Sequence, residues 1–126
     1  MTYQVIKMYG DFEPWWFLED WKNDITAIRE FQTYEDGLAY YQEEWQSLQE
    51  QFPKVNSKSN LMSAFWRTDD KRWCEECDED LQQYHSLLML GNWQELPEDL
   101  QDLNFDHRNA EGVHPTCSIK QHNTLS

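Results

Sequence analysis

Two cysteines at a C-x-x-C spacing are the part of the sequence with the most evident chemistry. The stretch WCEEC holds Cys74 and Cys77, a pair that supplies half of a zinc site. Near the C-terminus, His114 and Cys117 repeat the two-residue gap, so the four side chains would complete a tetrahedral Cys3His site. Nothing in the sequence shows that the two pairs meet. We therefore expect no cofactor and reduced, partly buried cysteines, with zinc at these four residues as the alternative.

The same pair is also typical of thiol oxidoreductases, where it follows a strand and an aromatic residue. Such an enzyme needs a thiolate, which positive charge stabilises. Here five carboxylates crowd the pair and only two cations offset them: Glu75, Glu76, Asp78, Glu79, Asp80, Lys71 and Arg72. Because this charge opposes a thiolate, a thiol oxidoreductase is the weaker alternative.

No other group of residues supports catalysis. The sequence has no glycine-rich phosphate loop, no G-x-S-x-G elbow and no nucleophile with an evident base. His85 could act as a general base, although a core histidine with one hydrogen bond is the commoner role. We lean towards a protein that is not an enzyme.

A second feature is the stretch MYGDFEPWWFLEDW, residues 8–21, which mixes aromatic and acidic side chains. If the residues after Pro14 form an alternating strand, Trp15 and Trp16 point to opposite faces and one of them lies near solvent. Large aromatic residues in such places commonly anchor partner contacts. We expect a partner-binding patch formed by Phe12, Glu13, Trp15, Trp16, Glu19 and Asp20. Asp11 is expected on its acidic rim as well. The alternative is that the tryptophans belong to the core.

The net charge of -14 at pH 7, from 10 Lys and Arg against 24 Asp and Glu, limits the kind of partner. Affinity for nucleic acid depends largely on cations that replace counterions on phosphate, so direct binding to DNA is disfavoured. The charge also repels anionic membranes and steers the molecule towards basic proteins. No apolar run reaches the roughly 18 residues that cross a bilayer, and no signal peptide is evident. We expect a cytoplasmic protein with a basic protein partner.

The spacing of apolar residues predicts the elements that must position these groups. A helix is expected from Thr33, which can cap it, to Phe52, because apolar residues recur there at steps of three and four before Pro53. Residues 81–90 fit either a helix or a strand buried on both faces, and we favour the strand. Residues 53–60 read as a polar loop. Further strands are expected at 2–9, 15–21, 26–31 and 61–66.

These elements predict an α+β fold, in which an antiparallel sheet of about four to five short strands is covered by one long amphipathic helix. Residues 1–97 form the expected domain. Residues 98–126 form a polar C-terminal extension that we expect to be partly disordered, with at most one or two helical turns at 96–103.

Two long motifs carry a family resemblance: YQVIKMYGDFEPWWFLEDW at 3–21 and RWCEECDEDLQQYHSLLML at 72–90. The chain resembles the uncharacterised bacterial family catalogued as domain of unknown function 1033, found in Gram-positive bacteria related to streptococci. The resemblance implies a context of transcription or competence, and some members of the family are labelled as DNA-binding proteins. DNA binding, with structural zinc, is therefore an alternative hypothesis. The resemblance implies no catalytic residues, so an acidic protein-protein interaction module is our preferred hypothesis.

Overall fold

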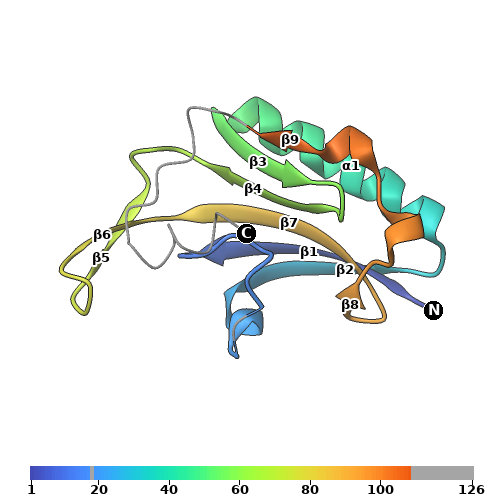
Figure 1. Ribbon diagram of the computed structural model, residues 1–126, viewed down its shortest axis with the longest axis horizontal. Helices are drawn as coiled ribbons and strands as arrows, with labels where there is room; N and C mark the ends of the chain where they lie inside the picture. Colours follow the sequence, from blue (N-terminus) through green and yellow to red (C-terminus); the bar gives the residue numbers. More distant parts are fainter. Residues whose placement is uncertain (18, 109–126) are drawn as a thin grey trace.

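The computed structural model describes residues 1–17 and 19–108, and one helix packs on an antiparallel sheet in it (Figure 1). The predicted α+β class is confirmed. The helix is α1 (Tyr34–Gln51), and three short 3-10 helices are η1 (Trp21–Asp24), η2 (Glu98–Leu100) and η3 (Leu103–Phe105). The strands are β1 (Tyr3–Gly10), β2 (Ile25–Phe31), β3 (Lys54–Lys58), β4 (Met62–Trp66), β5 (Lys71–Cys74), β6 (Glu79–Gln82), β7 (Tyr84–Gly91), β8 (Gln94–Glu95) and β9 (His107–Arg108).

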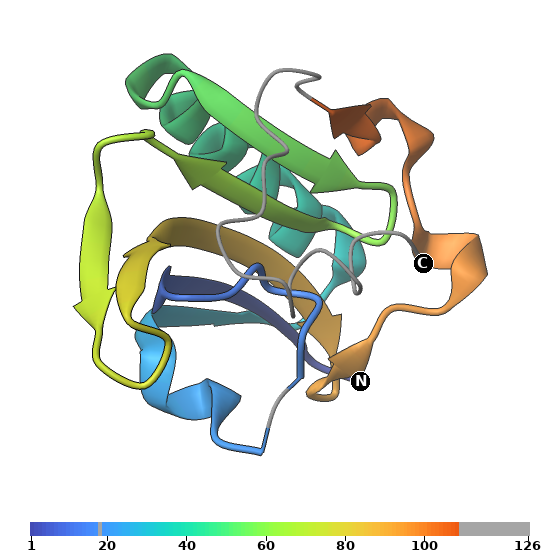
Figure 2. The same ribbon diagram turned by 60° about the vertical axis from the view of Figure 1, so that its left-hand side comes forward.

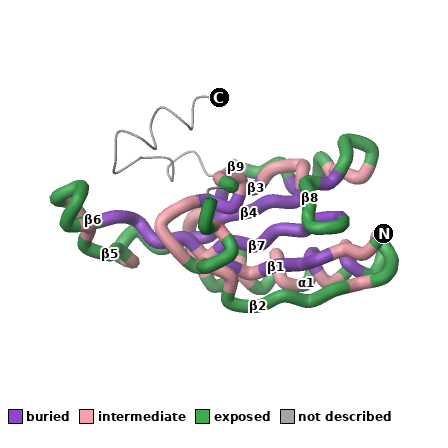
Figure 3. The backbone as a smooth tube through the Cα atoms, turned by 90° about the horizontal axis from the view of Figure 1, so that it is seen from below, coloured by how far each residue is buried: buried purple, intermediate pink, exposed green. Residues whose placement is uncertain are grey.

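The main sheet has the strand order β2-β1-β7-β4-β3-β9, and β8 pairs with the end of β7. Within the described residues it thus has seven strands, more than the four or five expected, because β8 and β9 are too short to predict and β3 was expected to be a loop. Strands β5 and β6 form a separate hairpin that extends beyond the main sheet (Figures 1 and 3). Among the described residues, no helix combines the length and apolar composition that a membrane crossing requires.

Strand β7 lies at the centre of the sheet. It pairs with β1 along its whole length, from Gly91 opposite Tyr3 to Tyr84 opposite Gly10, and with β4 on its other edge. Nearly all of its residues are buried (Figure 3). A strand covered on both faces needs apolar residues at successive positions, which explains the run LLML. The preference for a strand in this region is confirmed.

Helix α1 covers one face of the sheet, as predicted. Its first turn is capped by Thr33, whose Oγ1 accepts a hydrogen bond of 3.2 Å from the backbone N–H three residues later. Tyr41, in the middle of the apolar stripe, is fully buried, and its hydroxyl lies 2.6 Å from Ser63 Oγ on β4. Gly37 lets the helix lie close to the sheet, because a Cβ there would lie 2.7 Å from Met89 Cε.

A buried polar network joins the helix to strands β3 and β4. Ser57 Oγ and Ser63 Oγ lie 2.7 Å apart, and Trp45 Nε1 donates hydrogen bonds to them at 3.1 and 3.0 Å. Burial raises the pKa of Tyr41, whose hydroxyl belongs to the same network. Buried polar groups need such partners to offset the cost of leaving water. The prediction of a polar loop at 53–60 is therefore wrong, because the network lets the polar strand β3 face the core.

The segment between β1 and β2 covers the other face of the sheet (Figure 1). Trp15 and Trp21 pack there on an apolar cluster formed by Ile6, Met8, Met62, Leu88 and Leu90. The prediction of a strand at 15–21 is wrong. Most of these residues form turns or begin η1, and the N–H of Trp16 donates to the carbonyl of Glu13 at 3.3 Å. Trp15 and Trp21 are therefore partly buried by a loop that folds over the sheet, while Phe17 stays exposed.

The described residues after Leu96 pack on the helix-covered core. Phe105 is 7% exposed. The centroid of its ring lies 5.1 Å from that of Tyr41 and 5.8 Å from that of Trp45. Strand β9 pairs with β3. Of the helical turns expected at 96–103, η2 lies within that range, whereas η3 only begins at its last residue. Residues 98–108 of the C-terminal extension thus contact the core of the domain.

Candidate partner-binding site

Trp15 has a structural role in the packing of the sheet. The half-buried indole packs on the cluster around Ile6 and also on a second small cluster that contains Trp66 and Tyr84. Lys58 Nζ lies 4.2 Å from the centroid of the Trp15 ring, within the range of a cation-π interaction. Trp15 therefore holds the loop onto the sheet.

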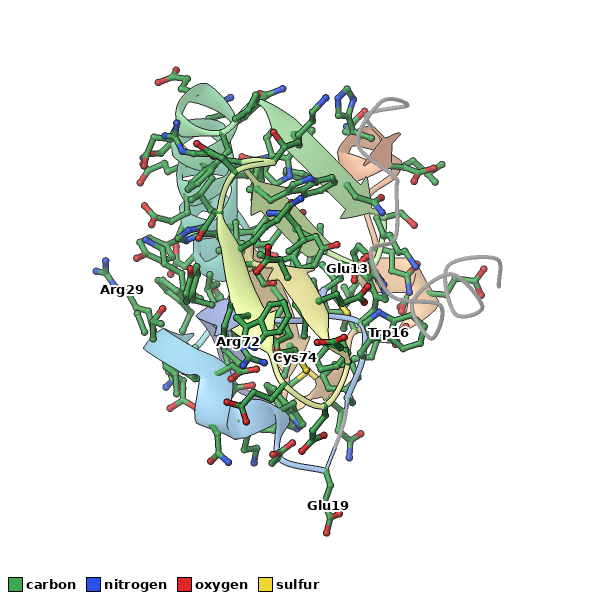
Figure 4. All side chains as sticks on the ribbon, turned by 90° about the vertical axis from the view of Figure 1, so that its left-hand side faces the viewer. Glu13, Trp16, Glu19, Arg29, Arg72 and Cys74 are labelled. Atoms are coloured by element: carbon green, nitrogen blue, oxygen red, sulfur yellow. The ribbon has the colours of Figure 1, made fainter. Side chains whose placement is uncertain are left out.

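The other residues of the predicted patch differ in how far they are buried and do not form one surface. Glu13 is only 6% exposed, so it does not lie on an acidic rim as expected. Trp16 is half-buried, and its Nε1 is buried without a hydrogen-bond partner in the described part of the chain. Glu19 is exposed and points away from the molecule (Figure 4). Of the predicted residues, the structure brings Phe12 and Asp20 together, along with Asp11 of the expected rim.

Phe12 and Asp20 line a cavity of about 410 Å³. It lies where the segment between β1 and β2 meets the β5–β6 hairpin, and Figure 2 shows these two segments side by side. Its walls combine three aromatic residues, three aspartates, one arginine and two further residues: Tyr9, Phe12, Trp21, Asp11, Asp20, Asp24, Arg72, Gly10 and Gln83. The volume falls within the usual range of ligand pockets, roughly 300–1,000 Å³.

Asp11 is held at the cavity wall by the hairpin. Arg72 Nε donates to Asp11 Oδ1 at 3.0 Å, and Arg72 Nη2 contacts the second oxygen in a bidentate ion pair. Gln83 Nε2 also donates to Asp11 Oδ1, at 2.7 Å. The hydrogen bond and the charge of Asp11 raise the pKa of Arg72. The negative charge of Asp11 is thus largely balanced within the protein.

Asp24 is less well compensated. Burial raises its pKa above the ordinary 3.8, and the charges of Asp11 and Asp20 raise it further, while Arg72 has the opposite effect. The carboxylate packs against bare backbone at Gly10, where a Cβ would lie only 2.7 Å from Asp24 Oδ2. Three carboxylates therefore share one guanidinium in this cavity, and an added cation would lower their mutual repulsion.

Asp24 and Arg72 are the site residues that the sequence does not predict. Gly10 indicates only a turn, and Arg72 lies 61 residues from Asp11 along the chain. One signal was available, since a glycine at the end of a strand often marks a close approach by another group. It does not say which group approaches.

The C-x-x-C pair lies at the tip of the β5–β6 hairpin. Cys74 ends β5, and Cys77 lies in the following turn, where its N–H donates to Cys74 Sγ at 3.3 Å. His114 and Cys117 lie outside the described residues. Within residues 1–17 and 19–108, no three or more His, Cys, Asp or Glu side chains form a group that could hold a metal ion.

His85, the candidate general base, is packed between two aromatic rings. Its ring centroid lies 4.6 Å from that of Tyr9 and 4.5 Å from that of Phe52. Burial lowers its pKa below the ordinary 6.5, although the nearby Asp70 has the opposite effect. These contacts favour the structural role over the catalytic one.

Comparison with known proteins identifies a family to which no activity is assigned. A family model described as a protein of unknown function (DUF1033) matches residues 2–119. No curated protein and no solved structure matches the chain. The chemistry of the cavity is therefore the basis for assigning a function.

Proposed function

The chain belongs to the DUF1033 family, which is described only as of unknown function. From the chemistry of the cavity, we propose that the protein is a non-enzymatic module that binds a basic protein. The observation that carries this proposal is the meeting of Asp11, Asp20 and Asp24 in one cavity with aromatic walls. A guanidinium or ammonium group of the partner would balance the surplus charge. The rings would contact the alkyl part or the charged face of that side chain.

The contacts of the chain's own cations support a protein partner over a nucleic acid. Binding to DNA depends on lysine and arginine side chains that face phosphate. Six of these side chains instead contact carboxylates, a carbonyl or aromatic rings of this chain: Lys7, Lys22, Arg29, Lys58, Arg67 and Arg72. The DNA-binding alternative thus has no specific observation in its favour. The link to transcription or competence rests on the family resemblance alone.

Replacing Asp20 and Asp24 together by asparagine is the direct test. The double variant is expected to bind an oligo-arginine peptide about tenfold more weakly at low salt, because two carboxylates that face the bound cation are removed. It should fold normally, since Asp24 is a carboxylate whose charged form is disfavoured in the folded protein. Isothermal titration calorimetry measures the affinity, and far-ultraviolet circular dichroism checks the fold.

A matched control separates the cavity from the overall charge. Glu43→Gln with Glu50→Gln makes the same change in net charge on exposed positions of α1, which covers the opposite face of the sheet. We expect this variant to lose less than about twofold in affinity. Equal losses in the two double variants would mean that the peptide binds diffuse surface charge, and the proposed site would be wrong. Affinity purification from cells with both variants should recover a basic protein only with the control.

The raised pKa of Asp24 predicts a pH dependence of binding. Between the ordinary value of 3.8 and its own higher pKa, Asp24 in the free protein is partly protonated, so affinity for the cationic peptide should rise as the pH rises through that window. Asp11, Asp20 and Arg72 are further charged groups that face the same cavity. The comparison is therefore made with Asp24→Asn, whose affinity should change less over the same range. Identical pH profiles would exclude Asp24 as a contact.

A further inference from the structure

Strand β2 forms one edge of the main sheet. It is the first strand in the order β2-β1-β7-β4-β3-β9, so within residues 1–17 and 19–108 it pairs only with β1. Its residues from Thr26 to Glu30 are all exposed, and Figure 3 shows the strand along the rim of the sheet. An edge strand presents a row of N–H and C=O groups with which a further strand can pair.

The two charged side chains of β2 already contact neighbouring residues of this chain. Arg29 lies over the ring of Tyr40, with its Cζ 4.8 Å from the ring centroid. Glu30 accepts a hydrogen bond of 2.8 Å from Gln4 Nε2. The pairing with β1 is regular over residues 27–31, and the charges of Arg29 and Glu30 cancel along this part of the strand. The edge of β2 therefore offers an extended backbone without net charge.

We propose that β2 accepts an extended segment of the basic partner as a further strand of the sheet, while a cationic side chain of that segment enters the cavity. This inference rests on the proposed function, because it uses the same cavity. Asp24 lines the cavity and directly precedes Ile25, the first residue of β2. Since a strand rises about 3.3 Å per residue, a cation one or two residues beyond the paired segment can contact Asp24.

The charge of the molecule favours a cationic partner over a second copy of this chain at the edge. Two copies, each with a net charge of -14, would repel one another. At the cavity end of β2, the carboxylates of Asp11, Asp20 and Asp24 share one guanidinium, that of Arg72. Arg72 is itself paired with Asp11. A cation supplied by an added strand would therefore be attracted to this end of the edge.

The direction of the added strand follows from the rest of the protein. Every strand pair within the described ranges is antiparallel, and antiparallel pairing is slightly more stable per residue than parallel pairing. A strand that runs antiparallel to β2 has its C-terminal end beside Ile25. The expected partner segment is therefore a neutral extended stretch followed by lysine or arginine, which binds by strand addition.

Three peptides of equal charge test the proposal on the full-length protein. The first has the sequence Thr-Val-Thr-Val-Thr-Arg-Arg, the second has the two arginines at its N-terminal end, and the third is the first peptide with N-methyl groups on its Thr and Val residues. We expect the third peptide to bind at least about tenfold more weakly than the first, because it lacks the N–H donors of the ladder. The second should also bind more weakly, because its arginines lie at the wrong end. Isothermal titration calorimetry measures the affinities.

Amide hydrogen exchange locates the added strand. When the first peptide saturates the protein, exchange of the amides in residues 27–31 should slow by about tenfold or more, whereas exchange in the middle of α1 should not change. In the double variant Asp20→Asn with Asp24→Asn, the first peptide should lose affinity but should still slow exchange in β2 once it saturates the protein.

Two results would overturn strand addition. Equal affinities of the three peptides, or unchanged exchange in β2, mean that the protein binds only the charge of the peptide. A dimer of the free protein in which the same amides are protected means that a second copy covers the edge. Oligo-arginine binding that depends on Asp20 and Asp24 but leaves exchange in β2 unchanged would refute strand addition and keep the proposed function, so the two failures are distinguishable.

Discussion

Replacing Phe65 by alanine is expected to lower the free energy of unfolding by about 3–5 kcal/mol, the usual cost of removing a buried aromatic ring. Phe65 lies on β4 beneath α1 and is fully buried. Its ring contacts that of Trp45 in an edge-to-face arrangement with centroids 5.7 Å apart. The variant would leave a cavity between helix and sheet that the surrounding side chains fill only in part. Urea unfolding followed by tryptophan fluorescence measures the change.

An exposed aliphatic position on the same sheet gives the control for this variant. Ile28 lies on the edge strand β2 and is 49% exposed. Ile28→Ala should cost roughly 1 kcal/mol or less, because little of its surface is removed from water on folding. If Phe65→Ala costs no more than Ile28→Ala, the helix-covered face does not supply the main core of the protein.

Replacing Trp15 by alanine is expected to lower the free energy of unfolding by about 2–3 kcal/mol. The indole is only half-buried, so the loss should be smaller than for a fully buried ring. It nevertheless packs on two apolar clusters of the second face, which the variant would expose to water. The loss of the Lys58 contact at 4.2 Å adds a smaller contribution. Urea unfolding followed by far-ultraviolet circular dichroism measures the change without relying on a tryptophan signal.

Trp73 provides a matched tryptophan control. It lies on strand β5 of the projecting hairpin and is 53% exposed. Trp73→Ala should change the free energy of unfolding by about 0.5 kcal/mol or less. Similar effects of Trp15→Ala and Trp73→Ala would contradict the conclusion that the segment between β1 and β2 covers the sheet.

The elements with strong local patterns could be predicted from the sequence. Helix α1 has a capping residue, a clear apolar stripe and a proline stop, and it occurs where predicted. Strand β3 could not be predicted, because its inward-facing Ser57 is polar and depends on partners from β4 and α1. Hydrogen bonds between elements far apart in sequence leave no local pattern.

The aromatic stretch shows a different limit of sequence patterns. Alternation predicts a strand at 15–21, but the partial burial of Trp15 and Trp21 comes from a loop that folds over the second face. Phe12 and Asp20 line one cavity, and they belong to one short segment. Arg72 joins them from a distant hairpin. Which distant element completes a loop-built site depends on tertiary packing and cannot be derived from the local sequence.

The segment between β1 and β2 has two roles at once, because it covers an apolar face and also forms most of the cavity wall. A molecule that fills the cavity would contact both this segment and the β5–β6 hairpin, and would hold the two together. Local opening of the sheet face would then become rarer, in proportion to the occupancy of the cavity. Ligands could thus be ranked by the rise that they cause in melting temperature, without knowledge of any biological activity.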